Sequence, residues 1–487
     1  MDTDALLAHI RSGPQGPRIG AFFDFDGTII DGYSASTLYR HQFRARQLGL
    51  GEAVRALKAS LGGPMTEQEF ETFLTAAICG WTGRPQSYLD TLGEQVYREG
   101  IAKNLFHEAW RLVKAHQRAG HTVVIASSAT RVQISTVARE LGITHILCTE
   151  LQVADGVVTG RLAGRTLWGD GKEAAIRTFA RRHRLPLANA YGYANGGEDI
   201  PFLGLLGHPY AVNPQPALAR AAALHGWPVL AFQRGTARLD PRPLLRTGGM
   251  GATLVGAGAA GVAMSVLSRD RQRGIDLMMS CYAQVGAAVG DVRVKVVRGH
   301  GHLCSHRPAV FLINHQSALI DLLVGATVLR KGVTALASKQ IGQMPIVGPM
   351  IGYPQVVFLD RADSGQARQT LAQALQRLQQ GVSILVAPEG TRSFTPSVGQ
   401  FTQDGFHLAR AAEVPLIPIV TRTSGQLMGR DSLTARPGTV EVVVHSPIPT
   451  KGWTSADVNQ ATRWVQQLYQ DTLEDWPEPA EPPTEQR

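Results

Sequence analysis

Short apolar runs alternate with helix-like patterns along the chain as far as residue 230. The runs Ile19–Phe25, His121–Ala126 and Ala188–Tyr193 have the length of strands, and segments with helical patterns lie between them. Strands that alternate with helices predict a parallel, Rossmann-like α/β sheet. Between about residues 32 and 116 the pattern is almost wholly helical, so we expect a helical cap over this sheet.

The same alternation returns after Asp291, and it predicts a second α/β domain. The expected strands are Val292–Val297, Ala309–Ile313, Thr334–Ala337, Val356–Leu359, Ser383–Ala387, Leu416–Val420 and Val440–Val444. Gln366–Gln380 has the pattern of an amphipathic helix. Pro415 and Pro418 stand in one apolar run, which we interpret as an edge strand because proline cannot donate to a sheet ladder.

Between the two α/β regions the composition changes to mainly small and apolar residues. Gly248–Leu267 carries no charge, and about 20 such residues are long enough to cross a bilayer, although few of them are Leu, Ile or Phe. A second apolar segment follows at Gly274–Gly290. Basic residues flank both segments: Arg242, Arg246, Arg269, Arg271, Arg273, Arg293 and Lys295. We expect a helical hairpin that anchors in one leaflet or spans weakly; the alternative is a pair of buried interdomain helices.

A chain of 487 residues exceeds what one hydrophobic core usually serves. The pattern predicts an α/β domain with its cap at residues 1–230, a linker and membrane-associated hairpin at 231–291, and the second α/β domain at 292–472. Residues 473–487 are rich in Pro and Glu and predict a disordered tail.

Charge and cysteine content limit which binding partners and which cellular compartment we expect. The net charge is +9, which suits nucleic acid and anionic lipid alike, but the charge is spread along the chain without a Lys/Arg block. We therefore favour a lipid surface and expect no nucleic-acid partner. The four cysteines show no CxxC pair, so free thiols in a reducing cytoplasm are expected. The N-terminus lacks the features of a signal peptide, which places the protein in the cytoplasm or on its membrane face.

Two carboxylates follow the first predicted strand, in the motif Asp24-Phe25-Asp26-Gly27-Thr28. Ligands of open α/β sheets bind at the carboxyl ends of the strands. Residues two apart on a strand face the same way, so Asp24 and Asp26 can act together as a nucleophile and a proton-transferring group that also attract a divalent cation.

This motif and its successors resemble the haloacid-dehalogenase-like phosphatases, and the phosphoserine-phosphatase-like branch among them. Ser127 after VVIA, Lys172 in GDGKEAAI, and Asn195 and Asp199 in YGYANGGEDIPFL follow in the family's order. The resemblance implies that Asp24 is the nucleophile and Asp26 the general acid/base, and that Ser127 and Lys172 bind the phosphate.

The resemblance also implies a Mg²⁺ ion held by Asp24, the carbonyl of Asp26, Asn195 and Asp199. Asn195 departs from the family, which has an acid there, and hard cations favour carboxylates. The alternative is a retained fold without phosphatase activity, which would serve as a scaffold or regulator.

A second constellation lies in the later half of the chain. His315 follows the apolar run AVFLI, and Asp321 lies six positions on in a helical pattern. A histidine held by a carboxylate is the arrangement for general-base activation of an alcohol. The segment Val386–Ser393 follows another strand and offers Glu389, Gly390, Thr391 and Arg392, and Arg361 ends a further strand. Arginine suits a bidentate grip on phosphate.

Together these segments resemble the four motifs of the glycerol-phosphate and lysophosphatidate acyltransferases. The resemblance implies that His315 deprotonates a glycerol hydroxyl, which attacks an acyl thioester while Asp321 orients the imidazole. It also implies that the acceptor and its phosphate are held by Arg361, Glu389, Gly390, Thr391 and Arg392, with added charge from Lys339, and that Pro415 and Pro418 shape the acyl side.

The spacing departs from the family, because five residues separate His315 from Asp321 where four are usual. Thr402 also stands where a basic residue is frequent. The combined prediction is a bacterial enzyme on the cytoplasmic face of the inner membrane. It would acylate lysophosphatidate, or a related glycerol phosphate, to phosphatidate with acyl-CoA or acyl carrier protein as donor. Its Mg²⁺-dependent phosphatase half would act on lysophosphatidate or phosphatidate, or alternatively on a small phosphomonoester such as phosphoserine.

Overall fold

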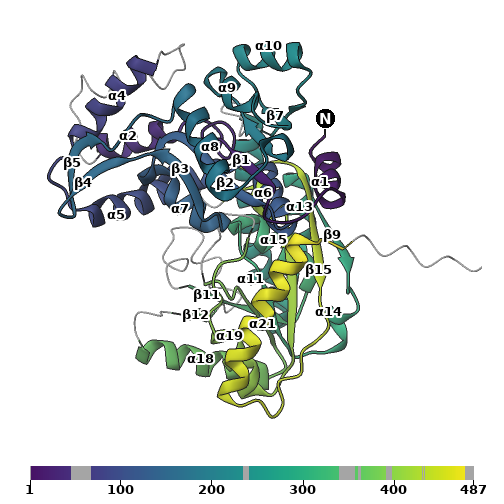
Figure 1. The fold of residues 1–487 in the computed structure, drawn as a ribbon. Helices are drawn as coiled ribbons and strands as arrows, with labels where there is room; N and C mark the ends of the chain where they lie inside the picture. Colours follow the sequence, from purple (N-terminus) through teal and green to yellow (C-terminus); the bar gives the residue numbers. More distant parts are fainter. Residues whose placement is uncertain are drawn as a thin grey trace, which may run out of the picture. The chain divides into compact units, whose positions relative to one another are not determined.

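The computed structural model describes residues 2–44, 67–233, 241–338, 357–359, 364–390, 397–429, 432 and 434–477. The chain divides into two compact units, Met1–Ala237 and Arg238–Arg487, whose elements are labelled in Figure 1. Each unit is described by itself below. The predicted tail falls largely on residues outside the described ranges.

The first unit is built on a six-stranded parallel sheet in the order β3-β2-β1-β6-β7-β8. The strands are β1 Gly20–Phe23, β2 Thr122–Thr130, β3 His145–Thr149, β6 Tyr191–Ala194, β7 His208–Val212 and β8 Val229–Leu230. All four residues of β1 are buried, as expected for an interior strand of a parallel sheet covered on both faces. This sheet confirms the predicted fold class of the N-terminal region.

Helices cover this sheet, and they are α1 Thr3–Ser12, α6 His107–Arg118, α7 Arg131–Leu141, α8 Asp170–His183, α9 Ile200–Leu203 and α10 Pro216–His225, with short turns η3 Leu187–Asn189 and η4 Gly197–Asp199. One core layer forms where Ile176 of α8 and Phe202 of α9 pack with Phe22 of β1, all three with no exposed surface. Apolar burial of this kind is the main stabilising contribution in such a layer.

The cap contains the expected helices together with a feature that the sequence analysis missed. Its helical elements are α2 Ser34–Arg44, α4 Glu67–Cys79, α5 Gln86–Val96, η1 Tyr97–Ile101 and η2 Ala102–Asn104. A two-stranded antiparallel ribbon, β4 Leu151–Ala154 and β5 Val157–Leu162, joins them through a bridge between Pro85 and Val157. The ribbon turns at Asp155-Gly156, both at positive φ, which is a hairpin signal that the sequence did carry.

The second unit begins with the predicted helical hairpin. Its first arm is α11 Pro241–Ser268, and its second arm is α12 Arg271–Cys281, continued by a π-helical turn η5 Tyr282–Gly286 and by α13 Ala287–Gly290. Asp270 caps α12 by accepting from the main-chain N–H groups of Gln272 and Arg273. Within the described residues, Arg242–Ser268 is the one helix long and apolar enough to cross a membrane, and only 28% of its most apolar window is buried.

A seven-stranded sheet follows, in the order β12-β11-β13-β10-β14-β15-β9, and it confirms the predicted second α/β region. Its strands are β9 Val292–Arg298, β10 Val310–Ile313, β11 Val333–Ser338, β12 Val357–Leu359, β13 Ser383–Val386, β14 Leu416–Arg422 and β15 Gly438–Val444. All pairs are parallel except β14 with β15. Its helices are α14 His302–Ser305, α15 Ala318–Leu329, α18 Ser364–Gln379, α19 Asp404–Ala412, α20 Ser424–Leu427 and α21 Ser455–Glu474.

The alternation of side chains along β10 separates the two faces of this sheet. Phe311 and Ile313 join a core with the hairpin and α15, whereas Val310 and Leu312 join a second core with α18, α19 and α21. The hairpin therefore buries one side against the sheet, and it is part of the fold of this unit.

The interpretation of the Pro418 segment as an edge strand is wrong. Strand β14 pairs with β10 on one side and with β15 on the other. The carbonyl of Pro418 accepts from the N–H of His445 at 2.9 Å, and antiparallel pairing is present on both sides of it, at Ile419 with Val444 and at Leu416 with Ile448. The proline therefore removes one donor from an interior strand whose neighbouring residues keep their hydrogen bonds.

Candidate active sites

The end of β1 brings together three groups that the sequence analysis singled out. Lys172, on α8, donates to Oδ1 of Asp24 at 2.8 Å and to Oδ1 of Asp199 at 2.5 Å. All three side chains are buried. Burial opposes a charged ammonium, but the carboxylates of Asp199 and Asp24 outweigh it and raise the pKa of Lys172 above its usual value. A permanent positive charge beside Asp24 suits a site for an anionic substrate.

Asp26 is held by the first residue of the cap helix α2. Its two oxygens accept from the main-chain N–H of Ser34 at 2.7 Å and from the Ser34 hydroxyl at 3.1 Å. Gln133 of α7 in turn donates to that hydroxyl at 2.8 Å. Burial raises the pKa of Asp26 to about 7, which the Ser34 bonds only partly offset. A carboxyl that titrates near neutral pH can give and take a proton.

The donor set at this edge fits a hard divalent cation. Oδ2 of Asp199 is buried without a hydrogen-bond partner, and an orphaned carboxylate oxygen is costly unless a cation neutralises it. Asn195, buried at the end of β6, lies against Gly27, where a Cβ would come within 1.9 Å of its Nδ2. Among the described residues no cluster of three or more His, Cys, Asp or Glu side chains could hold a metal. The ligand set implied by the family resemblance differs in kind, because it includes an amide and a main-chain carbonyl.

Ser127 lies on β2, the strand adjacent to β1, two positions beyond the pairing of Ile125 with Phe23. Its hydroxyl is buried and accepts from the main-chain N–H of Ala129 at 3.1 Å. The fold thus places it at the same sheet edge as Asp24.

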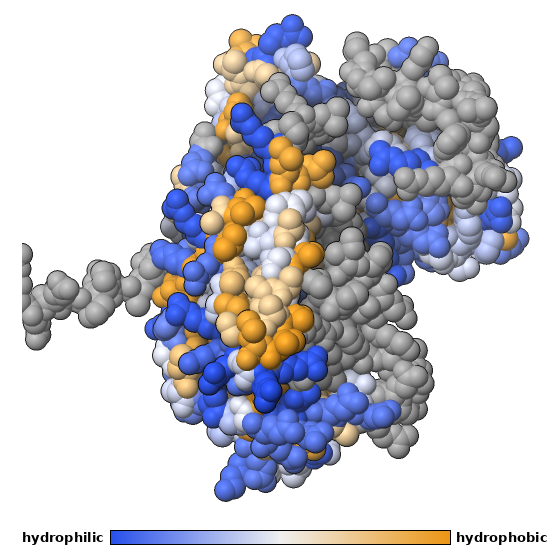
Figure 2. Space-filling view, turned by 180° about the vertical axis from the view of Figure 1, so that it is seen from behind, coloured by the Kyte–Doolittle hydropathy of each residue, from blue (hydrophilic) through white to orange (hydrophobic). Residues whose placement is uncertain are grey.

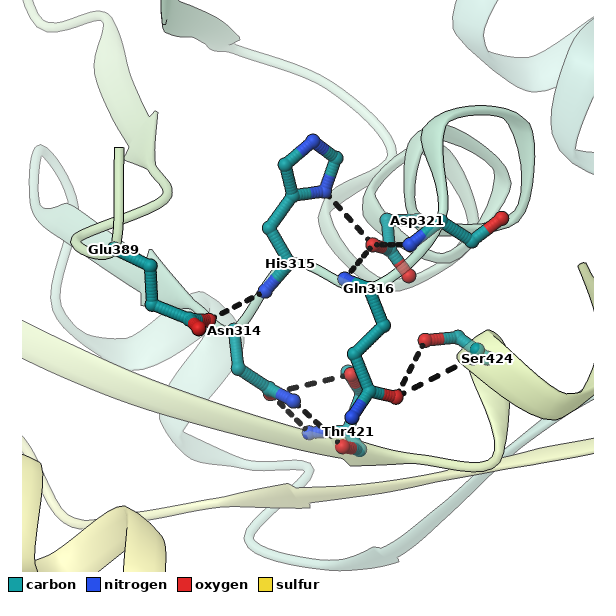
Figure 3. Close-up of polar contacts among 9 residues, drawn as sticks. Asn314, His315, Gln316, Asp321, Glu389, Thr421 and Ser424 are labelled. Atoms are coloured by element: carbon teal, nitrogen blue, oxygen red, sulfur yellow. Dashed lines mark hydrogen bonds and ion pairs between the residues drawn. The ribbon is translucent and has the colours of Figure 1, made fainter. Parts of the chain in front are cut away.

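The second site forms at the end of β10. Nδ1 of His315 contacts Oδ2 of Asp321 at 2.8 Å, and the ring is 20% exposed while the carboxylate is buried (Figure 3). Because a carboxylate accepts, Nδ1 carries the proton in the neutral imidazole. Nε2 then holds a lone pair, and Figure 3 shows it directed away from Asp321. This is the geometry of an oriented general base.

The extra residue between His315 and Asp321 is absorbed before α15 begins. Ser317 is extended, at φ −138° and ψ 135°, and the helix starts only at Ala318. Oδ2 of Asp321 also accepts from the main-chain N–H groups of Gln316 and Ser317 at 2.8 and 2.7 Å. The carboxylate therefore fixes the loop that carries His315 as well as the ring, so the wider spacing does not separate the pair.

Glu389 contacts the main chain of two loops. Its Oε1 accepts from the main-chain N–H of His315 at 2.9 Å, and its Oε2 accepts from that of Gly399 at 2.7 Å. Burial raises the pKa of Glu389 to about 7. The side chain thus joins the loop that carries His315 to the loop that carries Gly399, and Gly390 follows it at φ 67°.

Sequence analysis missed the hydrogen bonds that hold the strand ends beside His315. The side-chain amide of Asn314 donates to the carbonyl of Thr421 at 2.9 Å and accepts from the N–H of Thr421 at 2.7 Å. One step earlier the hydroxyl of Tyr469, on α21, donates to the carbonyl of Leu312 and accepts from the N–H of Ile419. Gln316 is also fixed, because its Oε1 accepts from Ser424 and Gly425 (Figure 3). Only the asparagine next to His315 gave any local signal.

Four residues of the predicted substrate site lie outside the described part of the chain: Lys339, Arg361, Thr391 and Arg392. Their proposed role in binding phosphate stays a prediction. Thr402 is described, and its hydroxyl contacts Asp404 at 3.2 Å.

An apolar cavity of about 70 Å³ lies beside α15. The hairpin lines one side of it through Leu254, Met278, Met279 and Tyr282. Helix α15 and the sheet line the other side through Leu322, Gly325, Ala326, Val333, Thr334, Ala335 and Leu385. Leu322 is the neighbour of Asp321 in sequence. The cavity is small, but methionine side chains adapt their shape readily.

Comparison with known proteins gives a separate match for each half of the chain. A family model described as haloacid dehalogenase-like hydrolase matches residues 21–204, and one described as acyltransferase matches residues 295–422. Phosphoserine phosphatase SerB1 of Mycobacterium tuberculosis is 33% identical over 282 residues, which cover 56% of this chain and 88% of that protein. An uncharacterized acyltransferase of Schizosaccharomyces pombe is 35% identical over 207 residues, which cover 41% of this chain and 74% of that protein.

Among solved structures, the 1-acyl-sn-glycerophosphate acyltransferase PlsC of Thermotoga maritima is similar at 26% identity and a TM-score of 0.40, over 48% of this chain and 95% of that one. The match to SerB1 covers more of this chain than the 237 residues of the first unit, so it continues past Ala237 into α11.

Proposed function

Since the chain belongs to the haloacid dehalogenase-like hydrolase family through its first unit and to the acyltransferase family through its second, we propose that it acts on glycerol phosphates with both. The second unit would transfer an acyl group to lysophosphatidate, or a related glycerol phosphate, and form phosphatidate. The observation that carries this proposal is the contact between His315 and Asp321, with Nε2 of His315 left to take a proton.

In this mechanism Nε2 of His315 takes the proton of the acceptor hydroxyl while the hydroxyl oxygen attacks the carbonyl carbon of an acyl thioester. The C–O bond forms and the C–S bond breaks, and the departing thiolate receives the proton from His315. Asp321 stabilises the imidazolium that exists between the two transfers. The donor would be acyl-CoA or acyl carrier protein, and its acyl chain would enter the apolar cavity between the hairpin and α15.

The first unit would hydrolyse a phosphomonoester through Asp24. Asp24 would attack the phosphorus and form an aspartyl phosphate, while Asp26 protonates the departing alcohol. Asp26 would then take a proton from a water molecule whose oxygen attacks the phosphorus, so that the bond to Asp24 breaks and inorganic phosphate leaves. Lys172 and Ser127 would bind the phosphate oxygens. Mg²⁺ would be held by Asp24, the carbonyl of Asp26, Asn195 and Asp199, and when bound it neutralises charge on the phosphate.

The outer face of the hairpin supports attachment to a membrane. Val255, Val262, Val266 and Leu267 are 40–81% exposed on α11, and the charged residues gather at its two ends. Figure 2 shows an apolar band on this face of the molecule, bordered by hydrophilic residues. A core helix would bury such a face, so we propose that it lies in the cytoplasmic leaflet of a bacterial inner membrane with arginines at headgroup depth.

We consider two classes of substrate for the phosphatase. A lipid, lysophosphatidate or phosphatidate, is favoured because the match to SerB1, which covers 88% of that protein, extends beyond the first unit into α11 of this chain, whose outer face is apolar and exposed. A small phosphomonoester such as phosphoserine is the second candidate, because that relative is named a phosphoserine phosphatase.

The test compares the wild type with Asp24→Asn and His315→Ala, in vesicles, by mass spectrometry of the lipids and by phosphate release with Mg²⁺. We expect His315→Ala to abolish phosphatidate formation and to keep phosphate release, and Asp24→Asn to do the reverse. Unchanged acyl transfer in His315→Ala would disprove the assigned base. If the wild type releases no phosphate from lipid or phosphoserine, the first unit is a scaffold or regulator.

A further inference from the structure

A hydrogen bond joins the hairpin to α15, the helix that carries Asp321. The hydroxyl of Tyr282, at the end of α12, donates to the carbonyl of Leu319 at 3.2 Å. Leu319 lies in the first turn of α15, two residues before Asp321. Tyr282 is 1% exposed, so water does not compete for this bond.

The local backbone is arranged to bring Tyr282 to this position. The residue begins the π-helical turn η5, where the hairpin departs from α-helical geometry. Its ring lies over Gly286: a Cβ at Gly286 would stand 3.0 Å from both Cδ2 and Cε2 of the ring, and 3.6 Å from Cδ1 of Leu323. The glycine thereby gives Tyr282 room and lets the hairpin approach α15 closely.

The first turn of α15 is where the geometry of the histidine is set. Oδ2 of Asp321 holds the ring of His315 and the N–H groups of Gln316 and Ser317 at 2.7–2.8 Å. A rotation or fraying of this turn moves all three contacts together. Tyr282 also lines the apolar cavity with Leu322, so a group that enters the cavity contacts the same tyrosine.

We propose that Tyr282 is a positioning residue for acyl transfer, which links the placement of the hairpin to the first turn of α15 and hence to Asp321 and His315. The inference rests on the proposed acyl transfer at His315. It implies that the hairpin takes part in the reaction, in addition to any attachment to a membrane.

The test uses the full-length protein with Tyr282→Phe, Gly286→Ala and the double variant, and with Ser280→Ala on the same helix as the matched control. Tyr282→Phe removes only the hydroxyl, so we expect kcat for acyl transfer to fall roughly three- to tenfold at unchanged KM. Hydrogen exchange of the Leu322 and Leu323 amides should become faster by a similar factor, with no change at the far end of α15. Ser280→Ala should match the wild type in both measurements.

Gly286→Ala should reproduce these effects by displacing the ring, and it should add little once the hydroxyl is gone. Multiplicative effects in the double variant would indicate two independent structural defects and would overturn the proposal. So would a wild-type kcat, or wild-type exchange, in Tyr282→Phe. If the wild type shows no acyl transfer at all, the proposed function fails, and the exchange rates still decide whether Tyr282 holds the first turn of α15.

Discussion

At the scale of single residues, Glu389 shows how a motif residue can act through the backbone. Both of its oxygens accept from main-chain N–H groups, those of His315 and Gly399. The sequence analysis expected this carboxylate to hold the acceptor substrate. Its described contacts instead favour a role in fixing the loop that presents the general base.

Glu389→Gln tests this interpretation. The amide offers one acceptor oxygen, and its NH₂ group would face a second N–H, so one of the two loop contacts is lost. A buried unsatisfied donor costs about 1–3 kcal/mol, and we expect acyl transfer to fall roughly ten- to a hundredfold, mainly in kcat. Steady-state kinetics provide the measurement, with the exposed Glu413→Gln as control. A change confined to the KM of the acceptor would instead favour direct contact with substrate.

Asn195→Asp addresses the one departure in the phosphatase site. An aspartate has nearly the same shape as the asparagine packed against Gly27, but it adds a negative charge at the end of β6, the strand that pairs with β1. We expect the Mg²⁺ concentration for half-maximal phosphate release to fall about tenfold, because hard cations favour carboxylates. A Mg²⁺ titration with p-nitrophenyl phosphate measures it, and Asn189→Asp serves as control. A weaker response to Mg²⁺ than in the wild type would exclude Asn195 as a ligand.

Local sequence patterns identified the candidate site residues, but they did not identify the residues that hold those side chains in place. Asp24, Lys172 and Asp199, which the family resemblance groups together, lie in contact, because α8 and the turn η4 bring Lys172 and Asp199 to the end of β1. The contacts of Ser34 with Gln133 and of Tyr469 with Leu312 were not foreseen. They join residues far apart in the chain, and no spacing rule reports such pairs.

At the scale of elements, a chain of hydrogen bonds links α6 to β6 in the first unit. Nε2 of His121 must donate to the carbonyl of Pro14, so its Nδ1 accepts from Nδ1 of His116 at 2.8 Å. Nε2 of His116 then accepts from the hydroxyl of Tyr193 at 2.8 Å. The Nδ1–Nδ1 contact holds a single proton, so the two rings cannot both be charged, and burial lowers the pKa of each.

This chain of bonds predicts acid sensitivity of the first unit. A histidine whose folded-state pKa lies below its unfolded value of about 6.5 leaves the unfolded state to bind more protons, so stability is lost as the pH falls below 6.5. We expect His116 to contribute a loss of stability between pH 7.5 and pH 5, of at most about 2 kcal/mol. Urea unfolding, followed by exchange of the β1 and β6 amides, measures it. His116→Gln should flatten this slope, whereas the exposed His225→Gln should keep it.

The element boundaries show which physical signals are strong in a sequence. Every strand predicted by an apolar run in the second half is present, because a fully buried strand needs a continuous apolar segment. The position of a strand in its sheet is a different property. Pro418 suggested an edge, but β14 is interior, and its neighbours on both sides of the proline keep their hydrogen bonds.

At the scale of the whole molecule, the outer face of the hairpin predicts how the protein binds vesicles. Val262→Asp combined with Val266→Asp places two charges in this apolar face, where burial of an aspartate in lipid is unfavourable by up to about 3 kcal/mol each. We expect binding to vesicles of phosphatidylglycerol and phosphatidylethanolamine to fall at least about tenfold in a flotation assay. Gln284→Asp, at an exposed polar position of the hairpin, is the control. Equal flotation of wild type and variant would assign this face to a protein partner.

The pairing of β9 with β15 also constrains the order in which the protein can fold on the ribosome. Met250 and Leu254 of α11 are buried in a core that contains Val440 and Val442 of β15, the last strand to be made. At 5–20 residues per second, roughly ten to forty seconds of translation separate these segments. The first unit can already be folded at this stage, while the apolar residues of the hairpin are not yet packed against the sheet. A nascent chain that meets a bilayer in this interval would be shielded from aggregation before its own sheet exists.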